Sequence, residues 1–271
     1  MSNVIKLSSP ATREFWEIPV LWEDEHLLAL NKPPLLLTSP DRSEQQRPNL
    51  MTLLHQAIQR GAPWARERSL SYLMNTHRLD AETSGVLLLA KSKAMLIALA
   101  DLFGSQRVTL TCVGLVQDVP PGEARTIEAK LAPDPVITGL MRVDLKEGKK
   151  SATKIQTRER FSGYALLECQ PLTHRPHQIR AHLRHIGFPL VGDTVYGGSP
   201  LLLSELKSAY RLKPKKTERP LLSYPALHVE ELSVVHPITS AEVKATAPWP
   251  KDLTVAVKYL RRYAGPATAA V

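Results

Sequence analysis

Short apolar runs, each bounded by polar or turn-forming residues, recur along this chain and constrain its fold more than any other feature. The run GVLLLAKS at 85–92 is fully apolar at its centre and indicates a buried strand. The β-branched or alternating segments at 107–118, 152–161 and 165–172 predict further strands. Because strands and helices do not alternate strictly along the chain, the sequence predicts an α+β fold.

Helical patterns occupy the segments 49–60, 93–104 and 176–187. In the first, leucines recur at helical spacing behind Asn49, a residue suited to cap a helix N-terminus. In the last, we expect Pro176 at the first helical position and Gly187 directly after the end.

The remaining segments define the expected domain organisation. Residues 1–18 are expected to form an irregular N-terminal arm, 19–262 a single catalytic domain and 263–271 a C-terminal tail. Within the domain, the segment 18–37 predicts a strand, a turn and a second strand. The segment 198–220, with KPKK at 213–216, is expected to form a surface excursion. The last predicted element is a β-hairpin within 226–250, followed by an irregular proline-rich exit.

The charge of the chain favours a polyanionic partner. Lysine and arginine total 35 against 26 acidic residues, which gives a net charge of +9 and an isoelectric point near 9.6. Such a balance is typical of proteins that bind nucleic acid or an anionic membrane, although a basic soluble protein without such a partner has the same composition. No signal peptide or membrane-spanning run is recognisable, and the two cysteines form no disulfide pattern, so we expect a cytoplasmic protein.

The first segment with chemical potential is HRLDAETS at 77–84, which places Asp80 on a polar loop directly before a buried strand. Loops held by a rigid strand often carry reactive side chains. An ordinary turn, in which the aspartate and hydroxyl side chains bond only to the backbone, has the same composition. The residues alone leave both interpretations open.

The second segment is THRPHQIRAHLRHIGFPLVGDTVYGG at 173–198. Arg180 and Arg184 are expected on one face of its helix, with His177 one turn earlier, which predicts an anion-binding surface near the helix start. A solvated basic face is the alternative. His182 and His185 would share a face and suggest a metal site, but no acidic ligand stands at a recognised spacing, so no metal is expected.

Four segments together resemble the RluA-type pseudouridine synthases. HRLDAETSG at 77–85 resembles the catalytic motif of that family, and HQIRAHLRHIGFPLVGDTVYG at 177–197 resembles its arginine-containing helix with the following loop. The segments 20–37 and 226–239 resemble its opening strand pair and its closing segment. The matches occur in the family's order and span residues 20–255.

This resemblance implies a catalytic domain with a mixed, mostly antiparallel central sheet. The implied activity is isomerisation of uridine to pseudouridine in structured RNA, ribosomal or transfer RNA, without cofactor or metal. A monomer is expected only as the default state. Asp80 would be the catalytic carboxylate, and Arg180 would keep it ionised. His77 would shape the loop. The residues expected to contact RNA are Arg78, His77, Lys32, Lys150, Lys154, Arg175, His177 and Leu110.

Two departures from the family pattern keep alternatives open. Leu110 stands where the family usually has a tyrosine that stacks on the target base. His174 stands where the family usually has a glycine, and a histidine there would be strained if the position requires a positive φ. One alternative is therefore an RNA-binding relative with weakened or no activity. Another, from a different class, is a metal-dependent RNA hydrolase built on the histidine-rich segment.

Overall fold

The computed structural model describes residues 3–41, 44, 46–212 and 216–265, and the chain divides into two compact units. The first unit comprises Met1–Leu110 and Val229–Pro248, and the second comprises Thr111–His228 and Trp249–Val271. The boundaries 19–262 of one catalytic domain stay a prediction. Most of the predicted tail, and three residues of KPKK at 213–215, lie outside the described residues.

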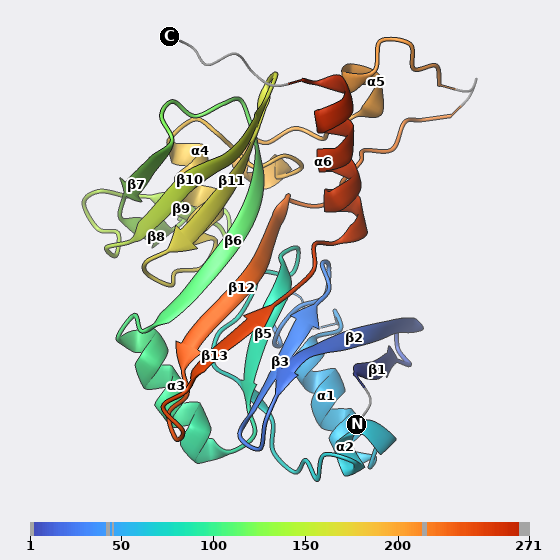
Figure 1. Cartoon of the computed structure of the whole chain (residues 1–271), viewed down its shortest axis with the longest axis vertical. Coiled ribbons are helices and arrows are strands. Elements are labelled where there is room, and N and C mark those ends of the chain that lie inside the picture. The colour runs from blue at the N-terminus through green and yellow to red at the C-terminus, as the bar shows by residue number, and fades with distance from the viewer. Residues whose placement is uncertain (1–2, 42–43, 45, 213–215, 266–271) are drawn as a thin grey trace. The chain divides into compact units, whose positions relative to one another are not determined.

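The first unit is built on a mostly antiparallel sheet whose central strands are strongly apolar (Figure 1). Its order begins β1 (Val4–Ser9), β2 (Glu14–Glu23), β3 (Leu27–Lys32), β5 (Ser84–Ala90) and β12 (Leu227–Val235), with β4 (Met74–Asn75) beside β5 and β13 (Glu242–Thr246) beside β12. The predicted strand pair at 18–37 and the hairpin within 226–250 are confirmed. The prediction of an irregular arm at the N-terminus is wrong, because residues 4–9 and 14–19 form a hairpin whose inward side chains, including Ile5 and Ile18, are buried.

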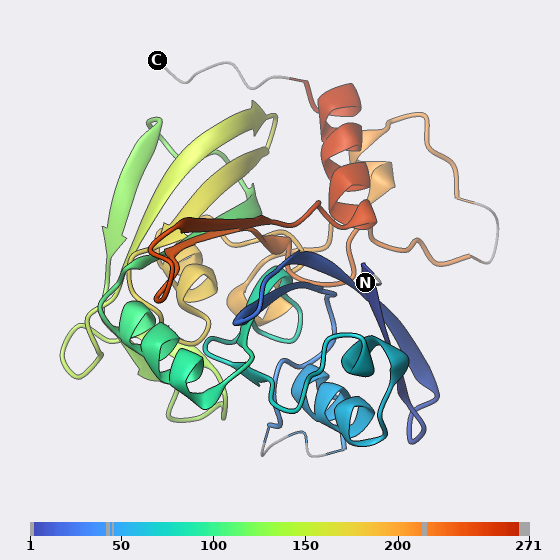
Figure 2. The same ribbon diagram turned by 60° about the horizontal axis from the view of Figure 1, so that its bottom comes forward.

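The helices of the first unit follow local signals. Helix α1 (Leu50–Gln59) begins where predicted, because the Asn49 side chain accepts a hydrogen bond of 2.9 Å from the Thr52 N–H. Helix α3 (Lys93–Gly104) is capped in the same way by Ser92, and the short helix α2 (Pro63–Arg66) follows α1. These helices can be followed in the turned view of Figure 2 by their blue and green colours.

The second unit contains the antiparallel strands β6 (Val108–Gln117), β11 (Tyr164–Pro171), β10 (Ala152–Phe161) and β7 (Ala124–Glu128), in that order. A separate two-stranded sheet pairs β8 (Leu131–Pro133) with β9 (Met141–Val143). The helices of the second unit are α4 (Gln178–His185), the 3-10 turn η1 (Thr194–Tyr196), α5 (Leu203–Leu206) and α6 (Lys251–Tyr263). The α+β class with mostly antiparallel strands is confirmed.

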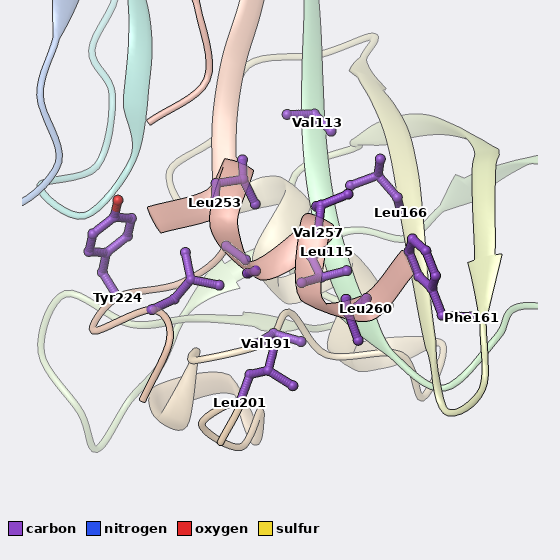
Figure 3. Close-up of a cluster of buried hydrophobic side chains, with 13 residues drawn as sticks. Val113, Leu115, Phe161, Leu166, Val191, Leu201, Tyr224, Leu253, Val257 and Leu260 are labelled. Carbon is purple, nitrogen blue, oxygen red and sulfur yellow. The ribbon is translucent and has the colours of Figure 1, made fainter. Parts of the chain in front are cut away.

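Helix α6 was not anticipated beyond the proline-rich exit, yet it supplies much of the core of the second unit. Leu253, Val257 and Leu260 are buried and pack with Leu115 and Phe161 of the sheet (Figure 3). Burial of such side chains contributes roughly 1.5–3 kcal/mol each, so this helix is part of the stabilising core. Among the described residues, no helix has both the length and the apolar character needed to cross a membrane.

Candidate active site

The loop that carries Asp80 joins β4 to β5, and its predicted place directly before a buried strand is confirmed. All seven residues of β5 are buried, which fixes the end of the loop. Gly85 at the start of β5 has a φ of +116°, and an added Cβ would lie 2.1 Å from the Val229 carbonyl oxygen. The glycine of the TSG sequence is therefore required by close packing of backbone against backbone.

Both neighbours of Asp80 are held by buried side chains, one from the end of β3 and one from the segment after it. The Thr38 hydroxyl donates to the Leu79 carbonyl at 2.8 Å and accepts from the Leu79 N–H at 3.2 Å. On the other side, the Lys32 ammonium donates to the Ala81 carbonyl at 3.0 Å. We call these contacts the loop clamp. They fix the backbone on either side of the half-buried Asp80.

Lys32 is fully buried (0% exposed), so the prediction that it contacts RNA phosphates is wrong. Its ammonium also donates to the carbonyls of Pro33 at 2.9 Å and Leu36 at 2.6 Å. Burial lowers its pKa to about 7, while the negative charges of Asp80 and Glu82 act in the opposite direction. The lysine therefore positions the loop and lies within the electrostatic reach of Asp80.

His77 has a structural position in the same loop. Its Nε2 accepts a hydrogen bond of 3.0 Å from the Leu88 N–H, and its ring stacks on Phe103 at 4.9 Å between centroids. An accepting Nε2 carries no proton, so the ring is neutral with its hydrogen on Nδ1. The Asn75 side chain donates to the His77 carbonyl at 2.9 Å. These contacts agree with a loop-shaping role and leave the predicted RNA contact untested.

Arg78 differs from its neighbours because its side chain is 63% exposed, and its nearest acidic partner, Asp41, is 3.9 Å away. A weakly paired, exposed guanidinium next to Asp80 in the sequence is suited to contact a polyanion. Its role in RNA binding stays a prediction.

The helix that carries Arg180 begins later than predicted. Pro176 is not in helix α4; the residue before the helix is His177, which has a left-handed conformation with φ 49° and ψ 19°. The strain expected at His174 is therefore found at His177, because His174 is not among the residues with positive φ. The helix ends before Gly187, whose φ of +86° confirms the predicted stop.

Arg180 is buried and forms a bidentate ion pair with Asp193. Its Nε and Nη2 donate to the two carboxylate oxygens at 2.7 and 2.8 Å, and the two side chains are 4% and 1% exposed. Arg184, predicted on the same face, is instead exposed. Asp80 belongs to the other compact unit, and its pairing with Arg180 stays a prediction.

The ring of Tyr196 packs against the guanidinium of Arg180. The Arg180 guanidinium carbon lies 4.9 Å from the Tyr196 ring centroid, a cation–π contact. The tyrosine hydroxyl accepts from the Met141 N–H at 3.0 Å, donates to the Met141 carbonyl at 3.1 Å and lies 3.0 Å from His177 Nδ1. Asp193, Tyr196 and Thr38 are not among the residues that the sequence predicts for the site. The GDTVYG segment was a usable signal for the first two, but Thr38 had none.

Lys150, Lys154 and Arg175 are exposed in the second unit. Arg175 also donates to the Lys150 carbonyl at 3.5 Å, which brings two of these cations close in space. Exposed cations of this kind are suited to phosphate contacts, which stay predictions. Leu110, the remaining predicted contact, is buried on β6.

The histidines of α4 have separate environments. His182 is fully buried and both of its ring nitrogens are engaged, Nδ1 with the Thr153 hydroxyl at 2.9 Å and Nε2 with the Ala129 carbonyl at 3.0 Å. His185 is exposed. Across the described residues, no cluster of three or more histidine, cysteine or acidic side chains is arranged to hold a metal ion.

Comparison with known proteins agrees with this arrangement. The family model described as RNA pseudouridylate synthase matches residues 26–185, which include Asp80 and Arg180. The "Ribosomal large subunit pseudouridine synthase D" of Xylella fastidiosa is 31% identical over 90% of this chain and 70% of its own length. The "Ribosomal large subunit pseudouridine synthase C" of Salmonella typhi is 30% identical over 89% of this chain and 70% of its own.

The fold is also that of solved structures. "Human RNA Pseudouridylate Synthase Domain Containing 4" superposes with a TM-score of 0.65, covering 89% of this chain and 92% of that one at 22% identity. The family match extends over more than half of the chain and includes the loop that the clamp holds. The chain therefore belongs to the RNA pseudouridylate synthase family, whose members are isomerases that convert uridine to pseudouridine in RNA.

Proposed function

We propose that this chain isomerises a uridine of large-subunit ribosomal RNA, with Asp80 as the catalytic carboxylate. The observation that carries this proposal is the loop clamp, since buried Thr38 and Lys32 bond to the two neighbours of Asp80. A carboxylate on a backbone fixed on both sides is preorganised for chemistry. The ribosomal substrate is supported by the names of the relatives from Xylella fastidiosa and Salmonella typhi.

The reaction requires an ionised carboxylate. The bond between N1 of uracil and C1′ of ribose breaks, the base turns, and C5 bonds to C1′. The hydrogen of C5 leaves as a proton while N1 takes up a proton, so the composition is unchanged. The Asp80 carboxylate acts at the ribose, either by attack on C1′ or by removal of a ribose proton. Within the loop clamp, the negative charge of Asp80 favours the charged form of Lys32, against the opposing effect of burial.

Arg180 is proposed to stabilise the same carboxylate. Asp193 holds the Arg180 guanidinium through its Nε and Nη2 hydrogens. The ion pair and the Tyr196 ring restrict the rotamers of Arg180, so its charge is held in one place. Asp193 and Tyr196 are then positioning residues for Arg180.

The RNA is proposed to contact the exposed cations Arg78, Lys150, Lys154 and Arg175. The target uridine has to leave its stack, at a cost of a few kcal/mol, before its sugar can reach a carboxylate. Arg78, next to the loop clamp, is suited to stack on the bases that remain. We further propose that the protein acts as a monomer in the cytoplasm.

Release of hydrogen from C5 tests the proposal. Ribosomal RNA and transfer RNA, each prepared from cells lacking this protein and tritiated at C5 of uridine, are incubated with wild type and with Asp80→Ala. Glu82→Gln, which removes another carboxylate of the same loop, is the matched control. Tritium release from ribosomal RNA by wild type and Glu82→Gln, but not by Asp80→Ala, is the expected result. Release by Asp80→Ala at the wild-type rate contradicts the assigned role, and release from transfer RNA alone contradicts the substrate.

Leu110 favours one second candidate, an RNA-binding relative with weakened catalysis. A buried leucine offers no hydroxyl and a smaller face to a base than tyrosine does. If wild type binds ribosomal RNA without releasing tritium, this candidate is favoured. Leu110→Tyr is then expected to restore release, whereas a variant that stays silent removes Leu110 as the cause.

A further inference from the structure

A cavity of about 340 Å³ opens on the second unit; Tyr196, which packs on Arg180, is one of its lining residues, but neither Asp80 nor Arg180 lines it. All of its described lining residues belong to that unit. They come from the segment around β9, from helix α4 and from the turn η1. The volume lies at the small end of the range for ligand sites, roughly 300–1,000 Å³, which suits one compact ligand better than a peptide helix.

The lining has buried and exposed apolar parts. Met141, Ala181 and Tyr196 are buried and belong to one hydrophobic cluster. Ile137 and Val195 also line the cavity, yet they are 55% and 54% exposed. Exposed apolar side chains gathered at a cavity are typical of a binding site. A flat apolar face, such as that of a nucleobase, would cover them, whereas a phosphate ion would not.

The cavity is lined by residues of both charges, basic ones on α4 and the acidic Asp134 before β9. Arg184 and His185 lie in the last turn of α4, and within the described part of the chain Arg184 has no ion-pair partner. Arg142 is already paired with Asp144 at 3.0 Å. An exposed guanidinium at this position is suited to one phosphate group.

Asp134 supplies a hydrogen-bond acceptor to the same cavity. Backbone N–H groups of Ile137 and Val136 bond to one of its oxygens at 2.9 Å and lower the pKa of the carboxyl group. The group is therefore ionised at neutral pH. A carboxylate repels a free phosphate but accepts hydrogen bonds from the N–H groups on the edge of an unpaired base.

We propose that this cavity binds one unpaired nucleotide of the RNA substrate, distinct from the uridine that reacts. The base packs on the apolar lining, its N–H edge faces Asp134, and its phosphate meets Arg184. This inference rests on the proposed function and extends it, because a second nucleotide read apart from the reacting base contributes to the choice of uridine. Single-stranded RNA is commonly recognised through such splayed-out bases.

The test uses the full chain carrying Asp80→Ala, so that no turnover occurs, with labelled isoleucine, valine and methionine methyl groups observed by NMR. The probes are single-stranded pentaribonucleotides of A, C, G or U, and inorganic phosphate alone. We expect saturable shifts of the Ile137, Val195 and Met141 methyl groups with at least one pentanucleotide. Arg184→Ala should weaken that affinity roughly 10-fold, the size of one lost charge-assisted hydrogen bond. Arg219→Ala, which removes an exposed charge elsewhere in the same unit, should leave it unchanged.

Three results would overturn the inference. Equal shifts with phosphate at the same concentration would identify an anion site only. Silent methyl groups, while fluorescence anisotropy shows the pentanucleotide bound, would place the nucleotide elsewhere and leave the cavity to another class of partner. An equal loss of affinity in both arginine variants would indicate net charge alone.

Turnover separates this inference from the proposed function. In the tritium assay, Arg184→Ala in the otherwise native chain should raise KM with kcat little changed, because a remote nucleotide is bound equally in ground and transition states. Tritium release with an unchanged KM would overturn nucleotide binding in the cavity while supporting the proposed synthase activity. Absence of release in wild type would contradict the synthase, and the methyl titration would still decide the cavity.

Discussion

Replacing Asp193 with asparagine would leave the Arg180 charge buried without its counter-ion. The two side chains are 4% and 1% exposed and share two hydrogen bonds of 2.7 and 2.8 Å. Loss of one partner from such a pair costs about 3–5 kcal/mol, against about 0–1 kcal/mol for an exposed pair. The asparagine amide adds to this cost if it directs its N–H groups at the guanidinium. For a chain of this length the melting temperature should fall by roughly 6–20 °C.

The assay is unfolding by urea and by heat, followed by circular dichroism, for Asp193→Asn, Arg180→Met and the double variant. Because the double variant removes both charges, we expect it to be more stable than either single variant. Exposed Arg158, paired with Glu168 at 3.0 Å, gives the matched control: Glu168→Gln should cost less than about 1 kcal/mol. A cost for Asp193→Asn as small as that of the control would refute the reasoning, and so would a double variant whose cost equals the sum of the single costs.

Three further predictions concern the loop and its strand. The pKa of Lys32 is about 7 in the folded protein, below its ordinary value of 10.5, so the unfolded chain binds more protons between pH 7 and 10.5. The stability of wild type relative to Lys32→Met should therefore rise with pH from 7 toward 10.5 and stay level below 7. Urea unfolding at a series of pH values measures this, and the opposite slope would contradict the burial argument. Thr38→Val should lower the free energy of unfolding by about 1–3 kcal/mol and lower kcat in the tritium assay, because two buried hydrogen bonds to the loop are lost. An unchanged kcat would show that catalysis does not need the loop clamp. Gly85→Ala should destabilise the protein by more than about 3 kcal/mol, because strain at positive φ adds to the collision with Val229. Gly163→Ala is the control, since Gly163 has a φ of +76° but open space around it, and should cost about 1 kcal/mol. Equal melting temperatures of the two variants would exclude the collision as the cause.

Local signals made much of the fold predictable. Asn49 caps its helix and Gly187 follows the end of another, because caps depend on the few residues around them. The missed helix α6 had the same kind of signal, since Leu253, Val257 and Leu260 follow helical spacing. The prolines directly before the helix, which favour irregular chain, conceal this spacing.

The candidate site was predictable only in part. The Asp80 loop before a buried strand could be read from the order of residues in the sequence. The burial of Lys32 could not, because the Ala81 carbonyl that accepts a hydrogen bond from its ammonium is 49 residues away. Nor could the left-handed conformation of His177, which depends on where α4 begins rather than on residue type.

The buried lysine also ties the loop to the pairing of two strands. Lys32 is opposite Gly85 at the end of the β3–β5 ladder. A slip of one residue in this pairing would turn the lysine to the other face of the sheet and remove the donor from the Ala81 carbonyl. Chains that collapse with the wrong strand alignment would then lack an ordered Asp80 loop, so the catalytic geometry would form only in molecules whose strands have paired correctly.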